Sequence, residues 1–134
     1  MSRQVRIAVL WFVLVVGMIL HFTYSLTGLR YGVSIESPNA TGVVPWSNVG
    51  LKATFYVVPA LLGTLTLYLK HRVFRILSTI AAALFLLANG AHFAAEGVTP
   101  ESSVQASQSI LLGTMVVWSL LLVVDCVRWW RKDP

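Results

Sequence analysis

The sequence predicts an all-α protein, a polytopic bundle of four transmembrane helices with both termini in the cytoplasm. Of its 134 residues 57% are hydrophobic and only 11% are charged, whereas soluble domains average roughly 25% charged residues. Four apolar runs each approach the about 20 residues that a helix needs to cross the hydrocarbon layer. Eight of the ten Lys and Arg residues flank one end of these runs. We therefore expect residues 1–134 to form a single integral membrane domain.

The first apolar run covers about residues 7–26 and follows the basic start "MSRQVR". This start resembles a secretory signal, but the run is longer than a typical signal core and no Ala-x-Ala cleavage site follows it. We therefore interpret it as the first span. Trp11 is expected at the membrane interface, where tryptophan is enriched.

The second run covers about residues 53–69, after a long loop at 27–52 that Gly, Pro, Asn and Ser residues interrupt. Pro59 lies inside this run. A proline inside a helix leaves the carbonyl four residues before it without its usual donor, here that of Phe55. We therefore expect the second span to bend near Pro59.

The third and fourth runs cover about residues 76–95 and 109–127. A tight basic turn, "KHRVFR", joins the second run to the third and makes them an antiparallel hairpin. Every backbone amide in hydrocarbon must be paired, and runs of this length without two-residue alternation exclude a membrane barrel. All four runs are therefore predicted to be helices.

The distribution of charge predicts the orientation. The eight basic residues at the end that carries the termini are Arg3, Arg6, Lys70, Arg72, Arg75, Arg128, Arg131 and Lys132. The positive-inside rule places this end in the cytoplasm, in a plasma or inner membrane. The net charge of +5 then reflects orientation and contact with membrane lipids, and no nucleic-acid partner is expected. Asp125 lies at the level of Arg6 and Arg75 and close to Arg128, which predicts an ion pair.

Polar residues follow one face of each predicted helix. Residues spaced alternately by four and three share a helix face, and in the third run this spacing joins Asn89, His92 and Glu96. Because polar side chains in a membrane bond between helices, we expect these faces to meet in an outward-opening pocket. Its predicted floor is Gly17, Pro59, Phe85 and Trp118. The predicted ligand-binding pocket comprises His21, Tyr24, Tyr56, Asn89, His92, Glu96, Thr114 and Trp118.

The fourth run contributes to this pocket the face that holds Leu111, Thr114, Trp118, Leu121 and Asp125. Glu96 and Lys52 are both expected at the rim of the pocket, where they could pair. The pocket depends on one geometric condition. The imidazoles of the first and third runs must face each other across the bundle.

Three roles for the histidines remain open from the sequence. They could serve only to fix the register of neighbouring helices. They could hold a haem b between the first and third helices, which run parallel. They could also bind a transition metal, because His92 and Glu96 lie one helical turn apart and His21 could supply a third ligand.

The predicted function is that of an accessory or assembly subunit of a larger membrane complex. The chain is short, and small residues at Gly90, Ala91, Ala94 and Ala95 offer a surface to other membrane subunits or to a second copy. One alternative is an outward-facing haem or metal site at His21 and His92, and another is a small transporter or pore. No Ser, His and Asp set or phosphate loop supports an enzymatic reaction.

Overall fold

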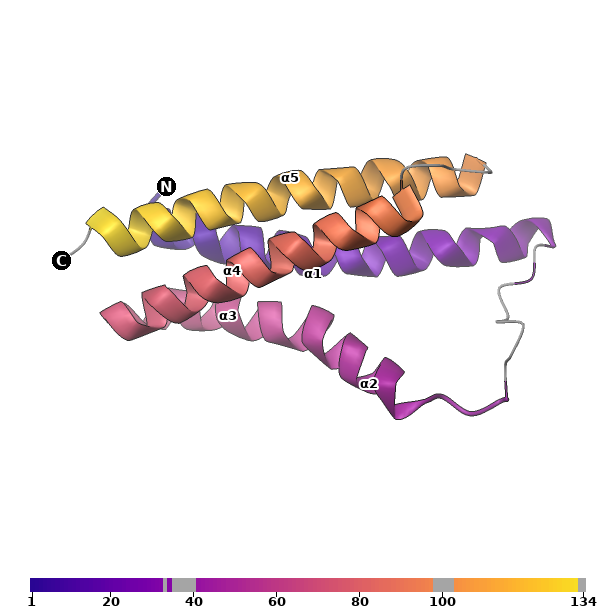
Figure 1. Ribbon diagram of the computed structural model, residues 1–134, viewed down its shortest axis with the longest axis horizontal. Helices are drawn as coiled ribbons and strands as arrows, with labels where there is room; N and C mark the ends of the chain where they lie inside the picture. Colours follow the sequence, from indigo (N-terminus) through magenta and orange to yellow (C-terminus); the bar gives the residue numbers. More distant parts are fainter. Residues whose placement is uncertain (33, 35–40, 98–102, 133–134) are drawn as a thin grey trace.

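The computed structural model describes residues 1–32, 34, 41–97 and 103–132, and all regular elements among them are helical (Figure 1). Four helices are long and apolar enough to cross a membrane, which confirms the predicted all-α fold with four spans. Their bounds are Arg3–Tyr31, Trp46–Tyr68, Arg72–Glu96 and Ala106–Arg131.

The first span begins with α1 (Arg3–Ser25) and continues as the 3₁₀ helix η1 (Leu26–Tyr31). The hydroxyl of Ser2 caps α1 by accepting a hydrogen bond from the backbone N–H of Val5. This cap satisfies a donor that the first helical turn leaves unpaired. The helix therefore starts before the apolar run, at the basic residues that precede it.

The second span joins α2 (Trp46–Lys52), the π-helical turn η2 (Ala53–Val57) and α3 (Val58–Tyr68). Pro59 lies in the first turn of α3, where its missing N–H is tolerated. The irregularity expected near this proline is thus a π turn directly before it. The predicted loop at 27–52 is helical at both ends, and its residues 33 and 35–40 lie outside the described part.

The third span comprises α4 (Arg72–His92) and a second π-helical turn, η3 (Phe93–Gly97). His71 caps α4, because its Nδ1 accepts a hydrogen bond from the N–H of Phe74 at 3.2 Å. The fourth span is α5 (Ser103–Lys132). Both spans are longer than the apolar runs that predicted them, since each helix extends into its polar flanks.

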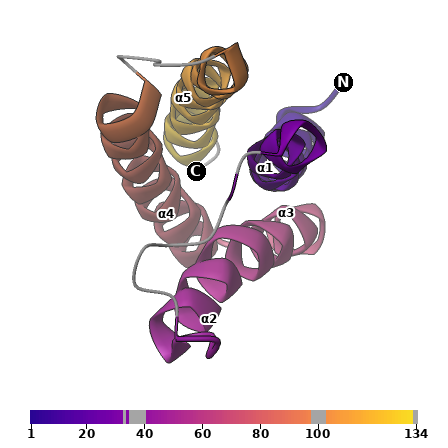
Figure 2. The same cartoon turned by 90° about the vertical axis from the view of Figure 1, so that its right-hand side faces the viewer.

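Helix α5 organises the bundle, because both α1 and α4 pack along it while α3 packs on the other side of α1. The end-on view in Figure 2 shows α2 lying away from α4 and α5. Both termini lie at one end of the molecule (Figure 1).

Aromatic side chains fill the centre of the bundle. The ring of Phe85 makes edge contacts with Trp11 and Phe55, at centroid distances of 5.4 and 5.6 Å. Trp11 is fully buried and Trp129 is 3% exposed, so the interfacial position expected for Trp11 is wrong. Gly63 makes room for Trp11, because a Cβ at position 63 would lie 3.1 Å from the Trp11 Cβ.

The face that α5 turns to the bundle overlaps the predicted face and extends one residue beyond it, because Leu111 and Asp125 of the predicted face are buried together with their neighbours Leu112 and Cys126. Leu121 of the predicted face is 50% exposed, whereas Leu122 is fully buried. The buried residues with heptad spacing are Leu112, Met115, Ser119, Leu122, Cys126 and Trp129. The predicted face was therefore only partly right, because in a membrane the outer side of a helix is as apolar as its inner side and aliphatic residues do not mark the rotation.

Candidate metal centre

His21 of α1 and His92 of α4 meet at the end of the bundle opposite the termini. Their Nε2 atoms lie 3.2 Å apart, and their rings make an edge contact with centroids 5.0 Å apart. The prediction that the two imidazoles face each other is confirmed. Two nitrogen lone pairs cannot approach this closely without a proton or a cation between them.

Glu96 joins the histidines from the π-helical turn η3. Its Oε2 lies 3.4 Å from Nε2 of His92. One ligand atom from each of His21, His92 and Glu96 can be chosen so that all lie within 4.8 Å of one another. Glu96 lies in this π turn and His92 directly precedes it, and such turns are frequent at functional sites.

Two of the three ligand separations fit a tetrahedral ion. Metal–nitrogen bonds of about 2.0–2.1 Å place two ligands of a tetrahedral zinc ion about 3.3 Å apart. The separations of 3.2 and 3.4 Å are close to that value. A bis-histidine haem instead needs its axial nitrogens about 4 Å apart on opposite sides of the iron. The pair as it stands therefore suits a single ion better than a haem.

The cluster is open on one side and closed on the other. The side chains of His92 and Glu96 are 38% and 55% exposed, while His21 is half-buried. Within the described residues, the buried Nδ1 of His21 has no hydrogen-bond partner. Metal-binding histidines usually donate their second N–H to a neighbouring acceptor, and loss of such a partner lowers affinity by about 10–100-fold. The side chains of His92 and Glu96 therefore leave the cluster accessible from one side.

Apolar packing on α5 supports the two histidine-bearing segments. Met18 of α1 and Phe93 of η3 both pack against a buried cluster on α5. This cluster consists of Leu111, Leu112 and Met115. Gly17 allows the close approach of α1, because a Cβ there would lie 3.0 Å from Cγ of Met115. The packing of Met18, one helical turn before His21, and of Phe93, directly after His92, thus fixes the positions of the two histidines.

The structure places three of the other predicted pocket residues in structural contacts. The buried amide of Asn89 donates a 2.8 Å hydrogen bond to Ser119 of α5. Thr114 donates to the carbonyl of Ile110 within its own helix at 2.8 Å. Trp118 is half-buried and packs against both core clusters.

The two tyrosines are not joined to the histidine cluster by any hydrogen bond within the described part of the chain. Tyr24 is 38% exposed and Tyr56 is half-buried. The expected pairing of Lys52 with Glu96 is also not observed. Lys52 instead places its Nζ 5.3 Å from the centre of the Phe22 ring, while Glu96 faces His92.

Ser119 is the polar core residue that the sequence analysis missed. Its hydroxyl accepts from Asn89 and donates to the carbonyl of Met115 at 2.8 Å. A serine within the aliphatic stretch "VVWSLLLVV" was a usable signal, since a hydroxyl in a membrane helix usually faces another helix.

Comparison with known proteins found no match among family models, curated proteins or solved structures. The class of the protein therefore rests on its own fold and site. These define a small helical protein with four membrane-spanning helices and a His–His–Glu cluster at the end opposite its termini.

Proposed function

We propose that this protein binds a divalent transition-metal ion through His21, His92 and Glu96, at the outer surface of a plasma or inner membrane. The observation that carries the proposal is the 3.2 Å separation of two histidine Nε2 atoms from different helices. A carboxylate oxygen 3.4 Å from one of them completes three ligands. Imidazole and carboxylate together suit zinc, copper or iron.

The orientation of this site follows from charge. Eight basic residues lie at the end of the molecule that carries the termini, and basic residues are retained on the cytoplasmic side. The His–His–Glu cluster is at the opposite end and would then face the exterior. Its exposed side chains make it accessible to ions outside the cell.

The chemistry of the site is that of capture and release. Three protein ligands leave the fourth position of a tetrahedral ion to water or to a ligand from a partner. The carboxylate offsets one of the two positive charges, so the bound ion keeps a net charge. Such a site can accept an ion from solution and pass it to a stronger set of ligands.

Metal titration of the purified protein tests this proposal. Zinc is the probe, and the variants are His21→Gln and His92→Gln. The third histidine supplies the control as His71→Asn, because asparagine preserves a helix N-cap. We expect one zinc ion per chain, a loss of affinity of at least about tenfold in each site variant and no change in the control. Equal affinities in all four proteins would contradict the proposal.

A second proposal, that the protein is an accessory subunit of a larger membrane complex, is supported by a surface beside the metal centre. A Cβ built on Gly90 would have no atom within 4 Å. Ala91, Ala94 and Ala95 are exposed. Small residues allow another helix to approach closely in a membrane, and a partner docked here could supply the fourth metal ligand.

Mild detergent extraction tests this second proposal. Co-purification of a defined partner that is lost in Ala91→Trp would support an accessory role. A chain that migrates alone, with the same size for the wild type and the variant, would contradict it. Metal binding is measured separately, so the two proposals can fail independently.

A further inference from the structure

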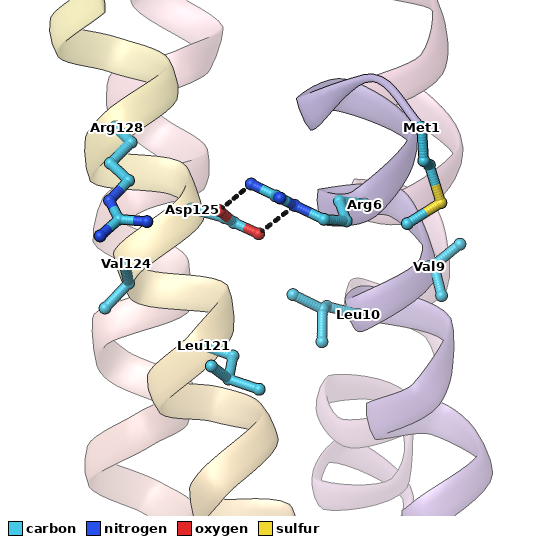
Figure 3. Close-up of a pocket in the computed structure, with 8 residues that line it drawn as sticks. All are labelled: Met1, Arg6, Val9, Leu10, Leu121, Val124, Asp125 and Arg128. Atoms are coloured by element: carbon cyan, nitrogen blue, oxygen red, sulfur yellow. Dashed lines mark hydrogen bonds and ion pairs between the residues drawn. The ribbon is translucent and has the colours of Figure 1, made fainter.

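Two apolar hollows lie side by side at the end of the bundle that carries the termini. The first lies between α1 and α5 and has a volume of about 370 Å³ (Figure 3). The second lies on α5 and has a volume of about 400 Å³. Val124 and Arg128 line both hollows, so the two form one continuous surface.

The walls of both hollows are mainly aliphatic. Val9, Leu10 and Leu121 line the first hollow, and Val123 and Val127 line the second. Each volume is more than ten times the about 30 Å³ that a water molecule occupies in the liquid. In a membrane span, such apolar hollows are filled by hydrocarbon chains and not by water.

The charged rim of this surface is positive. Asp125 is neutralised by Arg6, whose Nε and a terminal nitrogen donate to its two carboxylate oxygens at 2.9 and 2.5 Å (Figure 3). Among the described residues, no ion pair involves the side chains of Arg128 or Arg131. Figure 3 shows the Arg128 side chain on α5, running toward Val124. Within the described part of the chain, Arg128 and Arg131 thus have no acidic partner, and both line the second hollow beside its aliphatic walls.

We infer that this surface binds one anionic phospholipid from the leaflet at the terminal end of the molecule. Its phosphate would accept hydrogen bonds from Arg128 and Arg131, since arginine pairs favourably with phosphate oxygens. Its two acyl chains would lie in the two hollows. The Arg6–Asp125 pair separates the headgroup from the hollow below and keeps Asp125 from repelling the phosphate. This inference does not depend on metal binding.

Native mass spectrometry of the detergent-purified chain tests the inference, with added dioleoyl phosphatidylglycerol or dioleoyl phosphatidylcholine as probes. The two lipids have the same chains and differ in net charge. We expect one phosphatidylglycerol per chain to be retained in preference to phosphatidylcholine. Arg128→Gln should weaken its binding about fivefold, and the double variant with Arg131→Gln about 25-fold, the ratios expected for basic residues near anionic lipid.

Arg72→Gln is the matched control, because Arg72 is an exposed basic residue at the start of α4 that lines neither hollow. It should leave binding unchanged within about twofold, because Arg72 starts a different helix and contributes to neither hollow. Val124→Phe retains every charge and fills the region that the hollows share, so it should displace the lipid. Equal losses in Arg72→Gln and Arg128→Gln, or undiminished binding in Val124→Phe, would overturn the inference.

Discussion

The Nε2 atoms of His21 and His92 lie 3.2 Å apart although 71 residues separate them in the chain. Their helices, α1 and α4, both pack along α5, so the contact between the rings depends on the register of each helix against a third. A shift of one residue in either helix would move its histidine by about 1.5 Å along the helix axis and rotate it by about 100° around that axis. The pair therefore reports whether α1, α4 and α5 are correctly assembled.

Zinc should stabilise the folded protein. A ligand that binds only the folded state at 100 times its dissociation constant adds about 2.7 kcal/mol to the free energy of unfolding. Thermal unfolding in detergent, followed by circular dichroism, should show a higher midpoint with zinc and a return to the original value with a chelator. His21→Gln should lose this increase. An increase of the same size in that variant would place the ion elsewhere.

The two glycines at positions 63 and 90 should respond in opposite ways to alanine. At Gly63 a methyl group would meet Trp11, Phe12 and Ala8 atoms at 3.1–3.3 Å, so Gly63→Ala should destabilise the contact between α1 and α3 by about 1–3 kcal/mol. At Gly90 no atom lies within 4 Å of the new methyl group. Gly90→Ala should be neutral or stabilising by up to about 1 kcal/mol.

These glycine variants are compared by their unfolding midpoints under identical detergent conditions. Similar destabilisation in both would show that helix flexibility matters more than the close packing described for α3.

Replacing Arg6 and replacing Asp125 should lower the stability of the protein by different amounts. The side chain of Asp125 is 10% exposed and that of Arg6 is 44% exposed. Arg6→Met leaves a carboxylate buried without a partner and should cost about 2–3 kcal/mol of stability. Asp125→Leu leaves an arginine that can turn toward water, so it should cost about 1 kcal/mol. The double variant should recover to within about 1 kcal/mol of the wild type.

A double-mutant cycle on unfolding free energies measures this coupling. Strictly additive effects of the two substitutions would show that the pair contributes nothing by itself.

Much of the fold could be predicted from the sequence because the bilayer imposes a length and a polarity on each span. The four apolar runs correspond to the four spans, and heptad spacing brought His92 and Glu96 to the same face as Asn89. Asp125 was expected at the same depth as Arg6 and Arg75, which predicted an ion pair, and the structure shows this pair with Arg6. These predictions succeeded where a polar residue marks the inner face of a helix.

The remaining features could not be predicted because aliphatic side chains suit both lipid and protein interior. The predicted face of α5 was only partly right for this reason, since Leu111 and Asp125 are buried but Leu121 is exposed. Trp11 was expected at the interface, but Gly63 lets α1 and α3 approach closely at the Cβ of Trp11, whose ring packs against Phe85 in the core. The π turns that shift Tyr56 and Glu96 depend on packing between helices, which local sequence does not reveal.

X-ray absorption spectroscopy of the zinc-loaded protein tests the central claim most directly, because it identifies the atoms bound to the ion. We predict two imidazole nitrogens and at least one oxygen at about 2.0–2.2 Å, with one imidazole fewer in both His21→Gln and His92→Gln. The spectrum of His71→Asn should match that of the wild type. A first shell of oxygen alone, or a spectrum that neither site variant changes, would contradict the account.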